Sequence, residues 1–315
     1  MLDLFHIPSN TDSTKIFYAI SGSNSWQTWS KPRNAKFIQI FCLGGGAAGG
    51  SQGANVSSRA GAGGGGSAGF TRALFPAFLL PDALYVQPGA GGPLTPGLFA
   101  TAPGSTGNTG SISYVSIAPT SSAVCVLVQS SGAPALGGAS TSTNATSAGG
   151  TGAPIWVATS SSLSSLGIIV ATAGLNGGNS SNGLNGAVTN IQALGTTIVT
   201  GGAGGGASNN SSLAGGSILS ASVILTTTVN AGSRSVSIGN GVNGDSGYGS
   251  LAPFCGTGGA GGSGASGSGI VAGSGGSGWY GCGGGGGGTA YPATNNTGGN
   301  GGKGGDGLVI ITTIF

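Results

Sequence analysis

Residues that could do hydrolytic chemistry are few and widely spaced in this chain of 315 residues. The segment Gly65-Gly66-Ser67-Ala68-Gly69 matches a nucleophile elbow, whose serine needs a histidine base and an acid that orients the histidine. The single histidine, His6, has Asp3 and Asp12 as its nearest acids in the sequence, far from Ser67. A serine hydrolase is therefore not expected.

Two further catalytic patterns are also weak. Glycoside hydrolysis usually needs two carboxylates about 5 to 9.5 Å apart, but the chain has no Glu and five dispersed aspartates: Asp3, Asp12, Asp82, Asp245 and Asp306. The segment from Gly44 to Gly49 fits the dinucleotide pattern G-x-G-x-x-G directly after an apolar strand, yet no helix and no ribose-binding acid follow it. Chance matches are common in a chain so rich in glycine. We therefore expect no enzyme activity, no catalytic residue and no cofactor.

The four cysteines do not suggest a metal site. No two of them have the spacing of zinc ligands and no histidine stands near them. Cys42, between Phe41 and Leu43, is predicted to be a small buried hydrophobe. Cys255 and Cys282 could form a bridge between two glycine-rich turns, but free thiols are expected in a protein made in a reducing cytoplasm. Cys125 is the fourth cysteine.

Aromatic side chains are the remaining candidates for a binding site. Six of them stand among glycine, serine and asparagine, a composition that combines rigid contact area with adaptable hydrogen bonding. These receptor-binding candidates are Trp156, Tyr248, Phe254, Trp279, Tyr280 and Tyr291. The competing interpretation is packing, which is favoured for Trp279 and evenly balanced for Tyr248, Phe254 and Tyr291. Trp26 and Trp29 are expected in the core or at a subunit interface.

Charge excludes several kinds of partner. Only 4% of the residues are charged and the net charge is +3, which is too small and too scattered for a nucleic-acid surface. Lys31, Arg33 and Lys36 lie close together and are expected to form a solvated turn around Pro32. No stretch reaches 18 apolar residues and no secretory signal is recognisable, so no membrane insertion is expected.

Glycine dominates the chain, with 72 residues gathered in blocks such as Gly283 to Gly288. From Gly298 to Gly307 the glycines follow a strict period of three, interrupted by Asn300, Lys303 and Asp306. Three residues per turn is the repeat of an extended polyproline-II helix, which has no internal hydrogen bonds. Only glycine allows such backbones to approach closely enough to bond to one another. The predicted fold is therefore all-β with packed polyglycine-II helices and essentially no α-helix, and the interrupting side chains face solvent.

Short apolar runs predict the strands. The run from Ala35 to Leu43 is nearly continuous, which indicates burial on both faces, and the core is expected where it meets the strand from Leu308 onward. The other predicted strands are Leu2 to Ile7, Lys15 to Ile20, Ala83 to Gln87, Ser111 to Ile117, Ala123 to Gln129, Leu166 to Ala171, Thr196 to Thr200, Val223 to Val229, Ser235 to Ile238 and Leu308 to Ile314.

An ordered set of motifs resembles the glycine-rich domain of bacteriophage tail-fibre and related virion proteins. The set covers nearly all of the chain from about residue 26 and comprises Trp29-Ser30-Lys31-Pro32, FIQIFCLGGGAAGG from Phe37, VQPGAGG from Val86, TGGAGGG from Thr200, WYGCGGGGGG from Trp279 and GGNGGKGGDGLVII from Gly298. The resemblance implies a virion-attached fibre, tip or adhesin, often trimeric, and some such adhesins carry recognition loops at the ends of polyglycine-II helices. The chain departs from the long-fibre pattern because it has no coiled-coil heptads and no extended shaft.

These observations predict a non-enzymatic virion surface protein that mediates host attachment. Residues 1–32 would dock to other virion proteins, and residues 33–315 would form the glycine-rich domain that meets a bacterial receptor, either protein or glycan. A homotrimer is expected because it would bury glycine surfaces and strand edges. One alternative is a decoration or connector protein without a receptor. A remote alternative is an ice-binding protein, which would need longer in-register triplets.

Overall fold

The computed structural model describes residues 14–20, 25–53, 60–99, 104–134, 137–138, 147–156, 167–181, 185–187, 189–190, 198–207, 213–219, 228–233, 239–251, 254–291 and 295–315. Within these residues the regular elements are β-strands and one 3₁₀ turn, η2 (Ala77–Leu79). The predicted all-β class is therefore confirmed. The predicted strands Leu2 to Ile7 and Ser235 to Ile238, and most of Val223 to Val229, lie outside the described residues.

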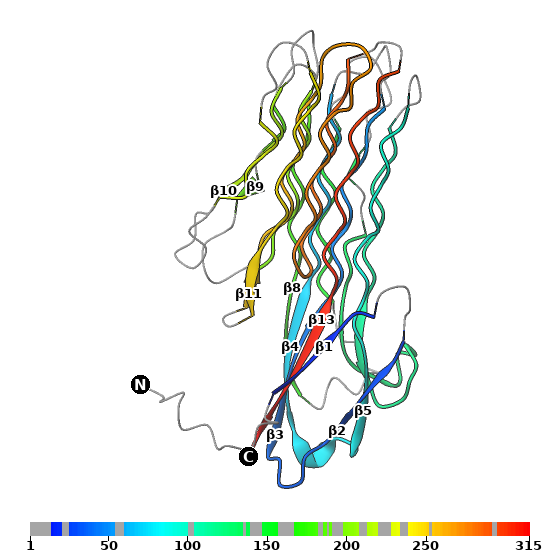
Figure 1. Ribbon diagram of the computed structural model, residues 1–315. Helices are drawn as coiled ribbons and strands as arrows, with labels where there is room; N and C mark the ends of the chain where they lie inside the picture. Colours follow the sequence, from blue (N-terminus) through cyan, green and yellow to red (C-terminus); the bar gives the residue numbers. More distant parts are fainter. Residues whose placement is uncertain are drawn as a thin grey trace.

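A five-stranded antiparallel sheet joins both ends of the described chain (Figure 1). Its order is β1 (Thr14–Tyr18), β13 (Leu308–Ile314), β3 (Phe37–Leu43), β4 (Phe70–Pro76) and β8 (Ile168–Thr172). The predicted meeting of the Ala35 and Leu308 runs is confirmed, since β13 pairs with β3 over seven residues from Leu308↔Leu43 to Ile314↔Phe37. Burial of β3 on both faces is wrong at its lower end, where Phe37 and Gln39 are exposed.

A second antiparallel sheet packs against one face of the first. Its order is β2 (Gln27–Ser30), β5 (Ala83–Gln87), β6 (Ser113–Ser116) and β7 (Val126–Ser130). Because β1 and β2 are integral strands of the two sheets, the sandwich continues across the predicted boundary at residue 32.

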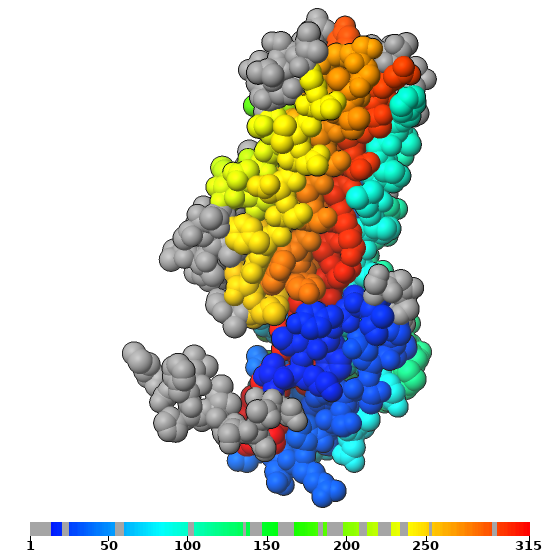
Figure 2. Space-filling model, viewed as in Figure 1, coloured from blue at the N-terminus to red at the C-terminus, as the bar shows by residue number. Residues whose placement is uncertain are grey.

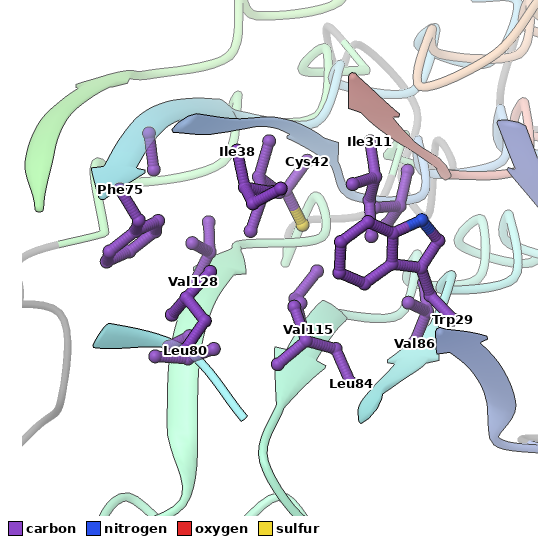
Figure 3. Close-up of a cluster of buried hydrophobic side chains, with 14 of the residues drawn as sticks. Trp29, Ile38, Cys42, Phe75, Leu80, Leu84, Val86, Val115, Val128 and Ile311 are labelled. Carbon is purple, nitrogen blue, oxygen red and sulfur yellow. The ribbon is translucent and has the colours of Figure 1, made fainter. Parts of the chain in front are cut away.

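The core lies between these two sheets (Figure 3). From the five-stranded sheet, Ile38, Phe75 and Ile311 point inward, and the four-stranded sheet contributes Leu84, Val115 and Val128 among others. Trp29 is only 3% exposed and lies in this core, one of the two places predicted for it. Most of the large fully buried side chains among the described residues belong to the strands of this sandwich, while Ile218 and Gln52 lie in the glycine-rich part.

The glycine-rich segments extend from the sandwich as a bundle of long, nearly parallel stretches (Figure 1). Their backbone hydrogen bonds change direction with a period of three. From Gly44 to Gln52, every third amide donates to segment 63–69, the next set donates to segment 105–111, and the last set donates to segment 299–305. A bonding direction that rotates by one third of a turn per residue is the geometry of a threefold extended helix.

The run Gly283 to Gly288 is the centre of this bundle. Its amides donate in turn to segments 200–206, 47–50 and 273–276, and its carbonyls accept from segments 62–65, 259–262 and 299–302. Six neighbours therefore surround one helix, and no direction remains for a side chain. A Cβ built on Gly285, for example, would lie 2.6 Å from the carbonyl carbon of Ala260.

Segments at the surface of the bundle carry one column of polar side chains. In segment 297–307 the glycines are buried while Asn300, Lys303 and Asp306 are half-buried. Two of these side chains also bond to backbone amides at the edge of the bundle. Asn300 Oδ1 accepts from Gly97 N at 2.6 Å, and Asp306 Oδ1 accepts from Gly91 N at 2.8 Å. Each bond satisfies a backbone amide that has no further helix beside it.

Side-chain oxygens also accept from backbone amides on neighbouring helices, which lie side by side on one wall of the bundle (Figure 2). Asn240 Oδ1 and Asn243 Oδ1 accept from the amides of Val271 and Ser274 at 3.0 and 2.8 Å. The spacing of three residues between these asparagines matches the helix repeat. Polar side chains every third residue thus mark the outer helices. Two short pairs complete the fold: β9 (Thr189–Asn190) with β10 (Ile218–Leu219), and β11 (Gly249–Leu251) with β12 (Phe254–Gly256).

Candidate functional site

The serine of the predicted elbow lies inside the glycine lattice. Ser67 is completely buried, and its Oγ accepts a hydrogen bond from Leu175 N at 2.7 Å. The Ser67 amide in turn donates to the carbonyl of Leu175. The hydroxyl therefore holds two segments together. His6, Asp3 and Asp12 lie outside the described residues.

The three described carboxylates stand on different elements with different partners. Asp82 pairs with Lys31 at 3.3 Å, Asp306 pairs with Lys303 at 2.8 Å, and Asp245 Oδ2 accepts from Asn230 Nδ2 at 3.3 Å. Among the residues that the structure describes, no group of three His, Cys, Asp or Glu side chains could hold a metal ion.

All four cysteines are free thiols. Burial raises the pKa of the Cys282 thiol to about 12 and raises the pKa of Cys42 still further. Both side chains are fully buried, as predicted for Cys42. At neutral pH these thiols stay protonated, so they act as small packing groups and not as nucleophiles.

Three of the six aromatic candidates meet at the waist, the level where the bundle joins the five-stranded sheet. The rings of Phe254 and Trp279 are 5.1 Å apart, those of Trp279 and Tyr280 are 5.1 Å apart, and Phe254 lies 5.0 Å from Phe41 of β3. All three candidates are half-buried. Burial raises the pKa of Tyr280, with smaller contributions from Tyr18 and Asp306. This waist cluster (Phe254, Trp279 and Tyr280) covers the upper part of the sheet.

Glycines make room for the waist cluster. A Cβ on Gly249 would lie 2.5 Å from Cε3 of Trp279, and a Cβ on Gly256 would also overlap the indole, so the ring rests on the backbone of the β11–β12 hairpin. Gly281 follows with φ of 67°, a left-handed conformation that glycine adopts without strain, and turns the chain back into the bundle. The packing interpretation accounts for these contacts. Receptor contact by the waist cluster stays a prediction.

The other three candidates are dispersed. Tyr248 packs with Ile218, Val229 and Cys255 in a separate cluster. Trp156 is half-exposed beside the exposed Ile155. Tyr291 lies at the distal end, defined as the end of the bundle opposite the sandwich, where its amide donates to the carbonyl of Ala265 at 2.8 Å. The structure thus brings together half of the candidates, and at the waist.

A buried asparagine organises the distal end. Asn296 is completely buried, its Oδ1 accepts from Ile270 N at 3.0 Å, and its Nδ2 donates to the carbonyls of Gly267 and Tyr291. These bonds tie together two chain reversals. Gly267, Gly269 and Asn295 have positive φ, which turns in this region require. The described part of the distal end is therefore fixed by side-chain hydrogen bonds.

Beside Asn296 lies an apolar surface that the sequence interpretation did not include. Thr297 is bridged to Phe99 on one side and to Val271 on the other. Phe99 is 60% exposed and Val271 is 50% exposed. We name Phe99, Val271 and Thr297 the distal patch. Phe99 follows Pro96-Gly97-Leu98, outside the glycine and asparagine surroundings used to select aromatics, but its position between two glycine-rich segments was a usable signal.

At the opposite end, the sandwich has a shallow cleft of about 560 Å³ lined by residues 30–35 and by Ala77, Phe78, Asp82 and Ala83. Lys31 is not simply solvated there, which corrects the prediction for this residue. Its Nζ donates to the carbonyls of Ala77 and Leu80 at 3.2 and 2.6 Å and pairs with Asp82. These bonds of Lys31 hold the β4–β5 connection in place. Phe78, in the same connection, is 83% exposed.

The described residues include no helix of the length and apolar character needed to cross a membrane. No protein-family model matches this chain, and no curated protein matches it. The surfaces themselves are therefore the basis for a functional proposal.

Proposed function

We propose that this chain is a bacteriophage virion protein, a tail-fibre or receptor-binding component that attaches the particle to its host. The distal patch would contact a receptor on the bacterial surface, either protein or glycan, and the sandwich end would face the other virion proteins. The mechanism is multivalent attachment without catalysis.

The observation that carries the proposal is the position of exposed apolar side chains on a rigid support. Phe99 is 60% exposed and Val271 is 50% exposed, and both are bridged to Thr297, beside the buried Asn296 at the distal end. The residues next to them are held in place: Gly298 N donates to Leu98 O, Thr297 N donates to Ile270 O, and Ile270 N donates to the buried Asn296 Oδ1. A rigid support lowers the entropy lost on binding, because the contact residues are already placed. Copies on one particle would then add avidity to weak single contacts.

A decoration protein without a receptor is the alternative. It would bury its aromatics against neighbouring subunits, and the half-buried waist cluster already packs within one chain. The exposure of Phe99 far from the sandwich favours attachment over decoration. The ice-binding alternative needs one flat face of short residues. The exposed wall of the bundle instead carries Val242, Leu94 and Phe99 among its polar side chains.

The test is binding of bead-displayed protein to a panel of bacterial strains, measured by flow cytometry. The variant Phe99→Ser with Val271→Ser should lose at least about tenfold in bound beads, since interface energy concentrates in a few central apolar residues. The matched control is Phe78→Ser, an exposed phenylalanine at the opposite end, which should bind as wild type does. Wild-type beads that bind no strain, or a distal double variant that binds normally, would contradict host attachment through this patch.

A further inference from the structure

The described residues leave much of one face of the five-stranded sheet uncovered. Alternate side chains point away from the four-stranded sheet and form what we call the outer face, while the remaining positions fill the core. The waist cluster covers the upper part of the outer face through Phe41 and Leu43. Lower down, Ile168 is 72% exposed, Val170 is 60% exposed and Phe37 is 42% exposed.

The strand register places these side chains in continuous rows. One row crosses all five strands through Ile16, Ile310, Phe41, Arg72 and Val170. The next row contains Thr14, Thr312, Gln39, Leu74 and Ile168. An antiparallel sheet that meets water usually has polar side chains on its solvent face. Six of these ten residues are apolar, so the outer face is a largely apolar surface that has no partner among the residues that the structure describes.

Charge limits what this surface can bind. Among the described outer-face positions Arg72 is the charged residue, and its guanidinium lies over the rings of Phe41 and Phe70, 5.7 and 5.5 Å from their centroids. An acidic or basic partner would therefore find little to pair with. A neutral apolar surface is complementary, and the same face of another copy is such a surface.

The exposed area is sufficient for self-association. Five large side chains, namely Tyr18, Phe37, Ile168, Val170 and Ile314, are each exposed by two fifths or more. With roughly 150 to 250 Å² for a whole large side chain, they present on the order of 500 Å². Two such faces would bury about 1,000 Å², the lower limit for a specific interface.

We propose that the outer face binds the same face of a second copy of this chain in a twofold-symmetric dimer. The glycine surfaces that suggested a trimer are buried within one chain by their own neighbours. The outer face takes their place as the surface that association would bury. This inference does not depend on host attachment.

The test is the mass of the full chain in solution, measured by light scattering during size-exclusion chromatography. Wild type should have twice the mass of one chain, which is 29.4 kDa. The variant Ile168→Lys with Val170→Lys should be monomeric, with a dissociation constant raised at least about a hundredfold by the uncompensated buried charges. Because both side chains are exposed, the variant monomer should fold, and its circular dichroism spectrum should match that of wild type.

Phe78→Ser is the matched control, since it removes an equally exposed apolar side chain that lies outside the outer face. Its mass should equal that of wild type. A monomeric wild type, a lysine double variant that still associates, or a Phe78→Ser variant that dissociates would each overturn the inference. Bacterial binding by a monomeric wild type would leave the attachment proposal intact and reject only this one.

Discussion

Replacement by alanine should destabilise the protein strongly at one residue of segment 297–307 and only slightly at the next residue. Gly302 faces the inside of the bundle, where a Cβ would lie 2.6 Å from the carbonyl carbon of Gly276 and would overlap its oxygen. Lys303, the next residue, faces outward with its side chain 45% exposed and paired with Asp306. One substitution adds a single carbon and the other removes a whole charged side chain.

The magnitude for Gly302→Ala follows from the overlap. Segment 297–307 must move away from its neighbour, and this movement weakens bonds such as Gly302 N to Gly285 O and Gly275 N to Asn300 O, both of 2.8 to 2.9 Å. Overpacking costs about 1 to 3 kcal/mol and each buried amide left unpaired costs about 1 to 3 kcal/mol, so the loss of one such bond brings the expected cost to about 2 to 6 kcal/mol. Lys303→Ala removes one largely exposed ion pair, which contributes about 0 to 1 kcal/mol.

The assay is urea unfolding followed by circular dichroism, with the free energy of unfolding compared for wild type and both variants. Gly302→Ala should lower the unfolding midpoint strongly and Lys303→Ala only slightly. If the two variants have free energies of unfolding within about 1 kcal/mol of each other, which is the spread expected of ordinary surface changes, the close packing of these backbones is refuted.

Three further predictions concern other parts of the molecule. Asn296→Ala should lower the free energy of unfolding by about 2 to 4 kcal/mol, because the buried amide of Ile270 and the part-buried carbonyls of Gly267 and Tyr291 lose their bonds. Thermal unfolding measures this, and an unchanged melting temperature would contradict it. The raised pKa of Cys282, about 12 against a usual 9.0, means that the folded state holds the proton more tightly. The contribution of Cys282 to stability should therefore be complete below pH 9 and fall above it by up to about 1.4 kcal/mol per pH unit, and Cys42, whose pKa burial raises further, adds a fall of its own. Urea titrations at pH 8 to 11 should show a shallower fall for Cys282→Ala, and an equal slope would contradict the assignment. Trp279→Ala should destabilise the waist by about 2 to 4 kcal/mol while the folded fraction binds bacteria normally, unlike the Phe99 variant; selective loss of binding would instead make the waist a receptor site.

Much of the fold was predictable because it depends on local patterns. The apolar run from Phe37 and the run from Leu308 to Ile314 are strands, and they are paired. The period of three from Gly298 to Gly307 identified an outward column that the structure shows as half-buried polar side chains. The strand β4 was not predicted, since Arg72 and Pro76 interrupt its apolar pattern although both lie at ordinary sheet positions.

The site was less predictable, because neighbours in a glycine lattice leave no trace in the sequence. Nothing in the run from Gly283 to Gly288 says that six particular segments surround it, since all its contacts are made by backbone atoms. Trp279 and Tyr280 stood in a context that suited binding, yet two distant glycines provide the surface on which the indole packs. Phe99 became a candidate only when its bridge to Thr297 placed it at the distal end.

The rigidity of the glycine bundle is the claim on which the attachment proposal depends, and amide hydrogen exchange measures it directly. A peptide covering residues 281–291 contains the run whose amides from Gly283 to Gly288 are all bonded to neighbouring segments. Its exchange, followed by mass spectrometry, should be as slow as that of residues 37–43 in the sandwich core, because both open only when the molecule unfolds. Complete exchange of this peptide within seconds, as in a flexible glycine linker, would contradict the account.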